Sequence, residues 1–199
     1  RLVAGLEMPD QGTMQRYGAP LDGPSHEVGI VFQEHVLFPW ISVLENVLLG
    51  YRLRRDEAAR RAAEPRARSL LGEVGLGDRL HDLPQTLSGG MRQRAALART
   101  LCEDRQIVLM DEPFGHLDAV TRLDLQDLAA HLLQGRTVVM VTHDPLEALR
   151  LGHEIRVLSG SPFAVGPVIA PPGSVPRDPG DAELLALQAR LIGELRSGA

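Results

Sequence analysis

The chain has 199 residues, of which 44% are hydrophobic, and this suits one domain, or one domain with a small subdomain, built around a sizeable core. Its net charge of −5 argues against nucleic acid as the main partner, since nucleic-acid-binding domains usually carry a basic excess. The single cysteine, Cys102, allows no internal disulfide. No apolar run reaches the roughly 18 residues that a membrane span needs, so we expect any membrane role to come through a partner.

The first half of the chain predicts one buried strand followed by a helical region. Val28–Phe32 is apolar and rich in β-branched residues, which favours a buried strand ending beside Gln33. From Ser42 apolar residues recur at helical spacing, and we expect helices as far as about residue 104. One of them should span 57–74, with a kink or a break at its interior proline, Pro65.

The second half alternates helices with apolar strands. Ser88 is expected to cap a helix that runs to about residue 103. After it we expect strand 107–110, helix 118–134, strand 137–141, helix 145–151 and strand 154–158. This alternation predicts βαβ units on a parallel sheet, and therefore an α/β fold. The proline-rich stretch 161–180 should be irregular, and the amphipathic pattern of 181–196 predicts a final helix.

Two segments of this pattern point to nucleotide chemistry. Ser88, Gly89 and Gly90 open a helix, where unpaired N–H groups and the helix dipole favour a phosphate. Asp111 and Glu112 follow four apolar residues, and carboxylates at the carboxyl end of a buried parallel strand face the crevice where α/β proteins bind ligands. Taken by itself, a Ser-Gly-Gly segment is more often a plain turn. A strand that ends in two acids is, by itself, more often an ordinary strand end. Together they favour a Mg²⁺ ligand at Asp111 and a water-orienting base at Glu112.

Over about residues 1–160 the chain resembles the ATP-binding cassette (ABC) ATPases. LSGGMRQR at 87–94 is similar to the family's signature motif, and IVLMDEP at 107–113 to its Walker B strand with the catalytic glutamate. In the same order as in the family, Val31-Phe32-Gln33 resembles the Q-loop, 115–118 the D-loop, and 141–144 the strand and switch histidine. The resemblance implies a P-loop NTPase fold, with an ATPase core at 1–40 and 105–160, an inserted helical subdomain at 41–104 and a C-terminal extension with a helix at 161–199.

The resemblance also implies ATP and Mg²⁺ as cofactors and gives roles to particular residues. Glu112, His143 and Gln33 would be catalytic, and Asp111 and Gln33 would bind or sense the metal. Ser88, Gly89 and Gly90 would close on ATP held by a second subunit. Asp118 would lie at the dimer seam. Two positions depart from the family pattern, since Met91 replaces a common Gln and His116 a small residue.

The family's phosphate loop, G-x-x-x-x-G-K-[ST], does not occur in this sequence. The chain has no lysine, because all 21 of its basic residues are arginine. Residues 1–6 resemble the helix that follows this loop in the family. We therefore expect the N-terminal strands and the phosphate loop to be absent through truncation, and the chain alone to be inactive. A natural, catalytically dead regulatory ABC module is the alternative.

Residues 38–47, beginning Phe38-Pro39-Trp40, are similar to the importer branch that carries nitrate, sulfonates, taurine or thiamine-precursor pyrimidines. This implies a homodimer formed through ATP at the cytoplasmic face of the inner membrane, a permease as direct partner, a solute-binding protein as indirect partner, and no nucleic acid. The Phe38-Pro39-Trp40 segment should dock the permease; the alternative is an apolar plug inside the helical subdomain. A DNA-repair ABC ATPase is disfavoured, because such proteins usually insert long coiled coils and only 54 residues separate Gln33 from Ser88.

Overall fold

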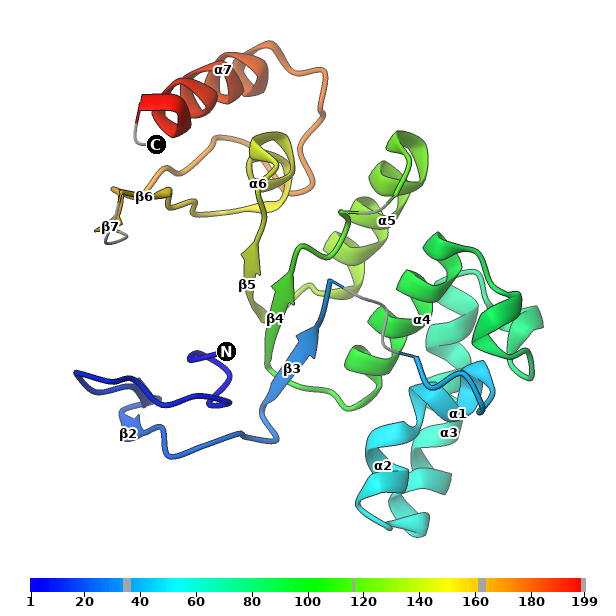
Figure 1. Ribbon diagram of the computed structural model, residues 1–199. Coiled ribbons are helices and arrows are strands. Elements are labelled where there is room, and N and C mark those ends of the chain that lie inside the picture. The colour runs from blue at the N-terminus through cyan, green and yellow to red at the C-terminus, as the bar shows by residue number, and fades with distance from the viewer. Residues whose placement is uncertain (34–36, 116, 161–163, 198–199) are drawn as a thin grey trace.

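A three-stranded parallel sheet forms the centre of the computed structural model, which describes residues 1–33, 37–115, 117–160 and 164–197 (Figure 1). Its strands, in the order β3-β4-β5, are β3 (Val28–Val31), β4 (Ile107–Asp111) and β5 (Thr137–Val141). Val31 pairs with Met110, and Asp111 with Val141, so the carboxyl ends of all three strands meet at one edge. Three of the predicted strands, 28–32, 107–110 and 137–141, and their parallel arrangement are confirmed.

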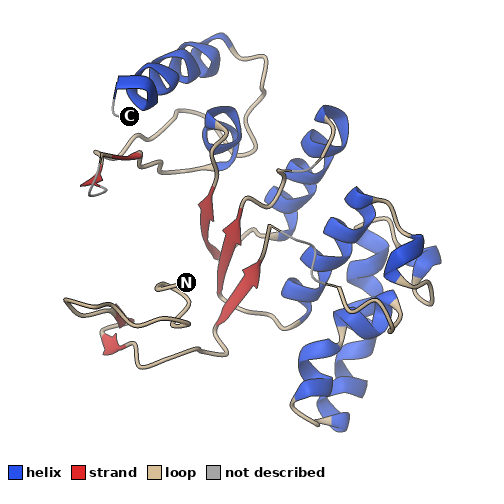
Figure 2. Cartoon of the chain, viewed as in Figure 1, coloured by secondary structure: helices blue, strands red, loops and turns tan. Residues whose placement is uncertain are grey.

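The helical region lies to one side of these strands (Figure 2). It consists of α1 (Val43–Val47), α2 (Leu49–Leu53), α3 (Glu57–Glu73) and α4 (Gly89–Cys102), with short 3-10 turns at Gly77–Arg79 and Pro84–Thr86. The predicted helix start at Ser88 is confirmed, because its side chain accepts a hydrogen bond from the Met91 N–H. Helix α4 packs on α1 and α3 and also on β3 and α5, so it joins the helical region to the sheet.

One hydrophobic core runs through both regions. It includes Leu48 of α1's C-terminal end, Leu71 of α3, Leu101 of α4 and Val108 of β4, all of them buried. Burying one such side chain contributes about 1.5–3 kcal/mol to the free energy of unfolding. Both the helical region and the sheet contribute side chains to this core. The predicted subdomain boundaries at residues 41, 104 and 160 stay predictions.

The remaining elements flank this core. Helices α5 (Ala119–Leu132) and α6 (Pro145–Leu151) follow β4 and β5, and α7 (Ala182–Ser197) packs on α6 through Leu149, Leu184 and Leu191. Two antiparallel pairs are very short: β1 (Gln15–Arg16) with β2 (Ala19–Pro20), and β6 (Leu158–Ser159) with β7 (Ala164–Val165). No helix in the described ranges is long and apolar enough to cross a membrane.

Two predicted elements are wrong. Residues 154–158 do not add a strand to the parallel sheet; Ile155 makes a single bridge to Ile169, and Leu158 pairs locally with Val165. This local pairing closes only a short loop and therefore costs little chain entropy. Residues 1–6 form turns rather than a helix, because so short a segment needs packing to stay helical and Leu2, Val3 and Leu6 are exposed.

Pro65 does not split its helix, so the predicted break is wrong, while the alternative of a kink stays a prediction. Helix α3 is continuous from Glu57 to Glu73, with the Asp56 side chain accepting from the Ala59 N–H at its start. Pro65 lies on the exposed side, while Ala67 and Leu71 on the other side are fully buried. Packing of this apolar side against α4 therefore offsets the hydrogen bond that proline cannot make.

Candidate functional site

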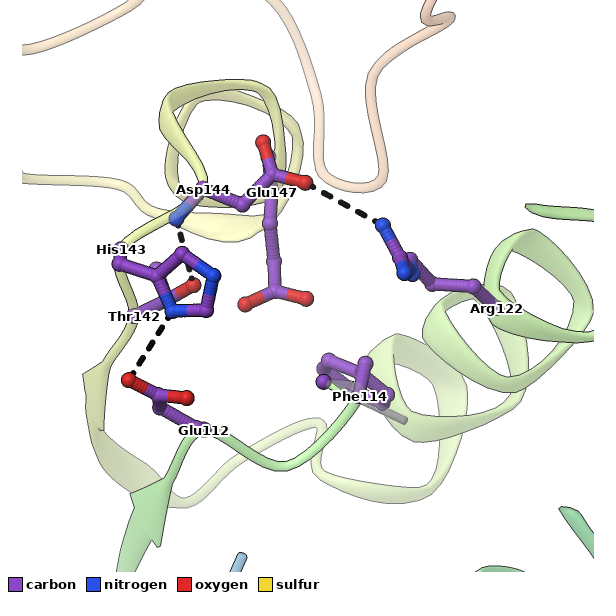
Figure 3. Close-up of a pocket in the computed structure, with 8 residues that line it drawn as sticks. Glu112, Phe114, Arg122, Thr142, His143, Asp144 and Glu147 are labelled. Atoms are coloured by element: carbon purple, nitrogen blue, oxygen red, sulfur yellow. Dashed lines mark hydrogen bonds and ion pairs between the residues drawn. The ribbon is translucent and has the colours of Figure 1, made fainter. Parts of the chain in front are cut away.

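Two of the predicted site residues contact the carboxylate of a third at the carboxyl edge of the sheet. Gln33 follows β3, Glu112 follows β4, and His143 comes two residues after β5. The Gln33 Nε2 donates a hydrogen bond to Glu112 Oε2 at 3.1 Å. His143 Nδ1 lies 2.9 Å from Glu112 Oε1 (Figure 3). Glu112 is thus held from both sides by the two residues that the sequence assigned to the same catalytic group.

The backbone of Glu112 adopts a conformation that is unusual for a residue with a side chain. Its φ of +42° lies in the left-handed region, which costs a non-glycine residue about 1–3 kcal/mol. The Glu112 N–H donates to the Val141 carbonyl at 2.9 Å, which anchors this turn to the end of β5. The sheet therefore maintains a strained turn that keeps the Glu112 carboxylate beside His143.

Asp111, the predicted metal ligand, ends β4 with an exposed side chain. Its carboxylate has no hydrogen bond or ion pair to any described residue, so its oxygens are available to a ligand. The described residues contain no group of three or more His, Cys, Asp and Glu side chains arranged around a metal. Mg²⁺ usually takes one or two carboxylates and completes its shell with water and phosphate, so an exposed single carboxylate fits a metal that binds together with a nucleotide.

The signature residues and the predicted dimer-seam residue lie at two neighbouring helix N-termini. Ser88 caps α4, and Asp118 caps α5 by accepting from the Thr121 N–H at 3.0 Å; hydrogen bonds to Thr121 lower the pKa of Asp118. Gly90 faces α5, since a Cβ built there would lie 2.8 Å from Thr121 Cγ2, whereas Gly89 faces open space. Backbone N–H groups at both helix starts favour an anion.

The structure brings the predicted residues together as two groups rather than one. Among the described residues, no hydrogen bond or ion pair joins Ser88 or Asp118 to the cluster at Glu112. A buried side chain links the groups indirectly, because Gln93 of α4 donates to the carbonyl of Pro113, next to Glu112. His116, which departs from the family pattern, lies outside the described residues, and so this part of the predicted D-loop is not described.

Three further residues, to which the sequence assigned no role of their own, line the pocket beside Glu112 and His143. They are Arg122 of α5, Asp144 at the start of α6, and Glu147 within α6 (Figure 3). Asp144 Oδ1 accepts from the Leu146 N–H at 2.9 Å, and its Oδ2 lies 3.5 Å from Arg122 Nη1. Burial raises the pKa of the Glu147 carboxyl. The run Asp144-Pro145-Leu146-Glu147 matches a helix-capping pattern, which was the one available signal.

A separate feature, the Phe38–Trp40 segment, is exposed at the surface. Trp40 is 71% exposed, and its ring lies edge-on to that of Phe38 with 5.2 Å between centroids. The buried Asn46 of α1 fixes this segment by accepting from the Phe38 N–H at 2.7 Å and donating to its carbonyl at 3.1 Å. The alternative of a buried plug is therefore wrong for Trp40.

Comparison with known proteins accounts for this combination of motifs. Residues 1–115 match the family profile described as "ABC transporter". The aliphatic sulfonates import ATP-binding protein SsuB 2 of Burkholderia cenocepacia (strain HI2424) is 42% identical, over 96% of this chain and 70% of its own length. The chain belongs to the ABC transporter family. It is an ABC transporter ATP-binding protein, and proteins of this kind bind ATP.

Other relatives agree with this membership. An uncharacterized ABC transporter ATP-binding protein of Haemophilus influenzae is 41% identical over 98% of this chain and 80% of its own length. The taurine import ATP-binding protein TauB of Chromobacterium violaceum is 38% identical over 98% of this chain and 77% of its own length. Among solved structures, the dimeric ATP-binding cassette MJ0796 in a post-hydrolysis state with ADP and Pi has a TM-score of 0.67 and 27% identity, covering 87% of this chain and 79% of that one. The ABC transporter protein therefore has the ABC ATPase fold.

Proposed function

We propose that this ABC transporter protein is the ATP-hydrolysing subunit of an importer for small sulfonates, such as aliphatic sulfonates or taurine. The solute class rests on the sulfonate- and taurine-import functions of the relatives at 38–42% identity. Hydrolysis rests mainly on the Glu112 carboxylate, with Gln33 and His143 each holding one of its oxygens. Nitrate and thiamine-precursor pyrimidines, which the sequence also suggested, are alternatives that a transport assay would separate.

In this proposal Glu112 orients the water that attacks the γ-phosphate. Each carboxylate oxygen has two acceptor positions, so the contacts to Gln33 and His143 leave one position free on each oxygen for water. A positioned general base contributes a factor of about 10²–10⁴, or roughly 3–5 kcal/mol of the barrier. Mg²⁺ at Asp111 would supply charge neutralisation on the phosphates. Gln33 and His143 then act by keeping Glu112 in place and by contacting the nucleotide.

Ser88 and Gly89 are proposed to act on ATP bound to a second subunit. Ser88 is exposed, and the position of a Gly89 side chain would face open space, so another molecule can approach the start of α4 closely. Asp118, capping the adjacent helix, would lie at the seam between the subunits. Because the sequence has no phosphate-loop lysine, residues 1–199 by themselves are expected to release phosphate from Mg-ATP only at background rate.

The composite site is tested by mixing two inactive variants of the full-length protein. Glu112→Gln should keep ATP binding but lose turnover, because it preserves shape while removing the charge. Ser88→Arg should block closure, and Ser69→Arg, on the exposed side of α3, is its control and should remain active. In mixed dimers one site carries both defects and the other carries neither, so part of the turnover should return. Heterodimers that form without any return of ATPase activity would contradict the cis role of Glu112 and the trans role of Ser88.

Docking of a permease is proposed at the exposed Phe38–Trp40 segment. Trp40→Ala in the full-length protein should weaken association with the membrane subunit by about tenfold or more, since aromatic anchors dominate such interfaces. Basal ATPase activity should stay within about twofold, because Trp40 is remote from the chemistry in this proposal. Tyr17→Ala is a matched control, because Tyr17 is equally exposed, at 74%, on a different segment. Equal co-purification of the permease with both variants would refute docking through Trp40.

A further inference from the structure

A chain of buried polar side chains connects α5 and α6 behind the pocket. Gln126 and Glu147 are 2% and 4% exposed, and Gln126 Nε2 donates to Glu147 Oε1 at 3.2 Å. The oxygen of the same amide also has a partner, because Arg150 Nη1 donates to Gln126 Oε1 at 2.8 Å. Arg150 is fixed in turn by Asp127 at 2.6 Å. The Gln126 side chain is thus held in one orientation, and it presents its N–H group to Glu147.

Glu147 extends this chain to the loop that carries His143. Thr142 and Glu147 line the same pocket, and the Thr142 side chain opposes the rise in the pKa of the Glu147 carboxyl that burial causes. The Thr142 Oγ1 accepts the Asp144 N–H at 3.1 Å. Asp144 is held from its other side by Arg122. His143 itself is 75% exposed in its side chain, so its orientation depends on its contact with Glu112 and on the two residues that flank it.

The orientation of Glu147 is not explained by capping of its own helix. Glu147 is the third residue of α6 after the cap Asp144, where a glutamate commonly bonds back to the N–H of the capping residue. Here Thr142 takes that N–H instead, and Glu147 points toward α5 and the pocket (Figure 3). A buried carboxylate is costly, and burial raises the pKa of this one, so a purely structural position would be better filled by an apolar residue.

We propose that Glu147 and Gln126 are positioning residues for His143, because they connect α5 to Thr142 and thereby fix the 142–144 loop that directs His143 at Glu112. The inference rests on the proposed role of His143 in ATP hydrolysis. Neither residue needs to touch the nucleotide. Their effect depends on accepted and donated hydrogen bonds, so a side chain of the same shape and hydrogen-bonding capacity should replace Glu147.

The test compares Glu147→Ala, Glu147→Gln and Gln126→Ala in the full-length protein, with Glu154→Ala as the control. Glu154 is an exposed acid just after α6, so its removal should change nothing. Glu147→Ala should lower kcat by about ten- to a hundredfold, because small misplacements of catalytic groups cost that much, while the KM for ATP stays within about twofold. Glu147→Gln should keep kcat within about threefold, since it preserves the shape of the side chain and its amide oxygen still accepts from Gln126. The double variant Glu147→Ala/Gln126→Ala should be no slower than Glu147→Ala, because both changes break the same chain.

A second readout does not depend on activity. In histidine-labelled protein, the ring resonances of His143, assigned with His143→Gln, should shift in Glu147→Ala and Gln126→Ala but not in Glu147→Gln or Glu154→Ala. Wild-type kcat and an unchanged His143 resonance in folded Glu147→Ala would overturn the inference, as would equal losses in the Gln and Ala variants. A full-length protein without substitutions that hydrolyses no ATP would instead contradict the proposed function, and the His143 resonance would still test the positioning.

Discussion

Gly89 and Gly90 are adjacent in the signature motif, yet their surroundings differ at the scale of single residues. Gly89 has no atom within 4 Å of the position where a Cβ would stand, whereas a Cβ on Gly90 would meet Thr121 Cγ2 at 2.8 Å. The second glycine is therefore required by packing within the subunit. The first is explained by packing only if another molecule approaches it.

Alanine at the two positions should separate stability from activity. Gly90→Ala should destabilise the fold by about 1–3 kcal/mol through overpacking against the stiff Thr121 side chain, less a few tenths gained from helix propensity. Gly89→Ala should leave unfolding unchanged or raise its free energy by about 0.4–1 kcal/mol, but reduce ATPase activity of the dimer. Thermal unfolding and phosphate release measure the two effects. Thr121→Ser removes the contacted methyl group, so it should rescue Gly90→Ala; no rescue would show that the contact is not the cause.

The apolar strands and the family motifs together were sufficient to bring three candidate site residues to one edge of the sheet, but they did not show what supports these residues. Gln33, Glu112 and His143 each follow an apolar strand, and parallel strands bring their carboxyl ends to one edge. Glu147 instead contacts Gln126, on a different helix 21 positions away. The local capping pattern around Asp144 gives no sign of that contact, because it depends on how α5 and α6 pack. The strained turn at Glu112 is likewise a consequence of the assembled sheet.

At the scale of secondary structure, local signals located elements well wherever packing agreed with them. Caps at Asp56, Ser88 and Asp118 start their helices as their side chains favour. The predicted strand 154–158 failed because an apolar run does not specify which neighbour it will pair with. Pro65 shows the opposite case, in which tertiary packing keeps a helix continuous across a residue that disfavours it.

Pro65→Ala should therefore stabilise the protein. Pro65 is exposed within α3, so alanine creates no cavity and restores a backbone donor. The expected gain in the free energy of unfolding is about 1–3 kcal/mol, the range between partial and full relief of the cost of proline in a helix. Arg61→Ala, on the exposed side of the same helix, is the control and should change stability by less than about 0.5 kcal/mol. Denaturant unfolding measures both, and a destabilised Pro65→Ala would mean that proline fits a bend that the packing against α4 needs.

At the scale of the whole molecule, the sheet has an open side. Strand β5 pairs with β4, and no described strand pairs with its other edge. Its sequence, Thr-Val-Val-Met-Val, has high β propensity, and Val138, Val139 and Val141 are exposed. Unpaired N–H and C=O groups along an exposed apolar strand are a template for pairing with another chain.

Residues 1–199 are accordingly expected to self-associate through β5 as concentration rises, and to unfold without a sharp transition. Val139→Lys should reduce light scattering at high concentration, because a charge on an edge strand opposes pairing between chains. Val120→Lys is the matched control: Val120 is 70% exposed, but it lies on α5, so the same charge there should leave association unchanged. Opening of the core can be followed separately through Cys102, because burial raises the pKa of its thiol to about 11 and alkylation then requires exposure. The expectation is contradicted if the chain remains monomeric at every concentration and if Cys102 is alkylated slowly until one cooperative melting step. That result would mean that the β5 edge is protected in solution.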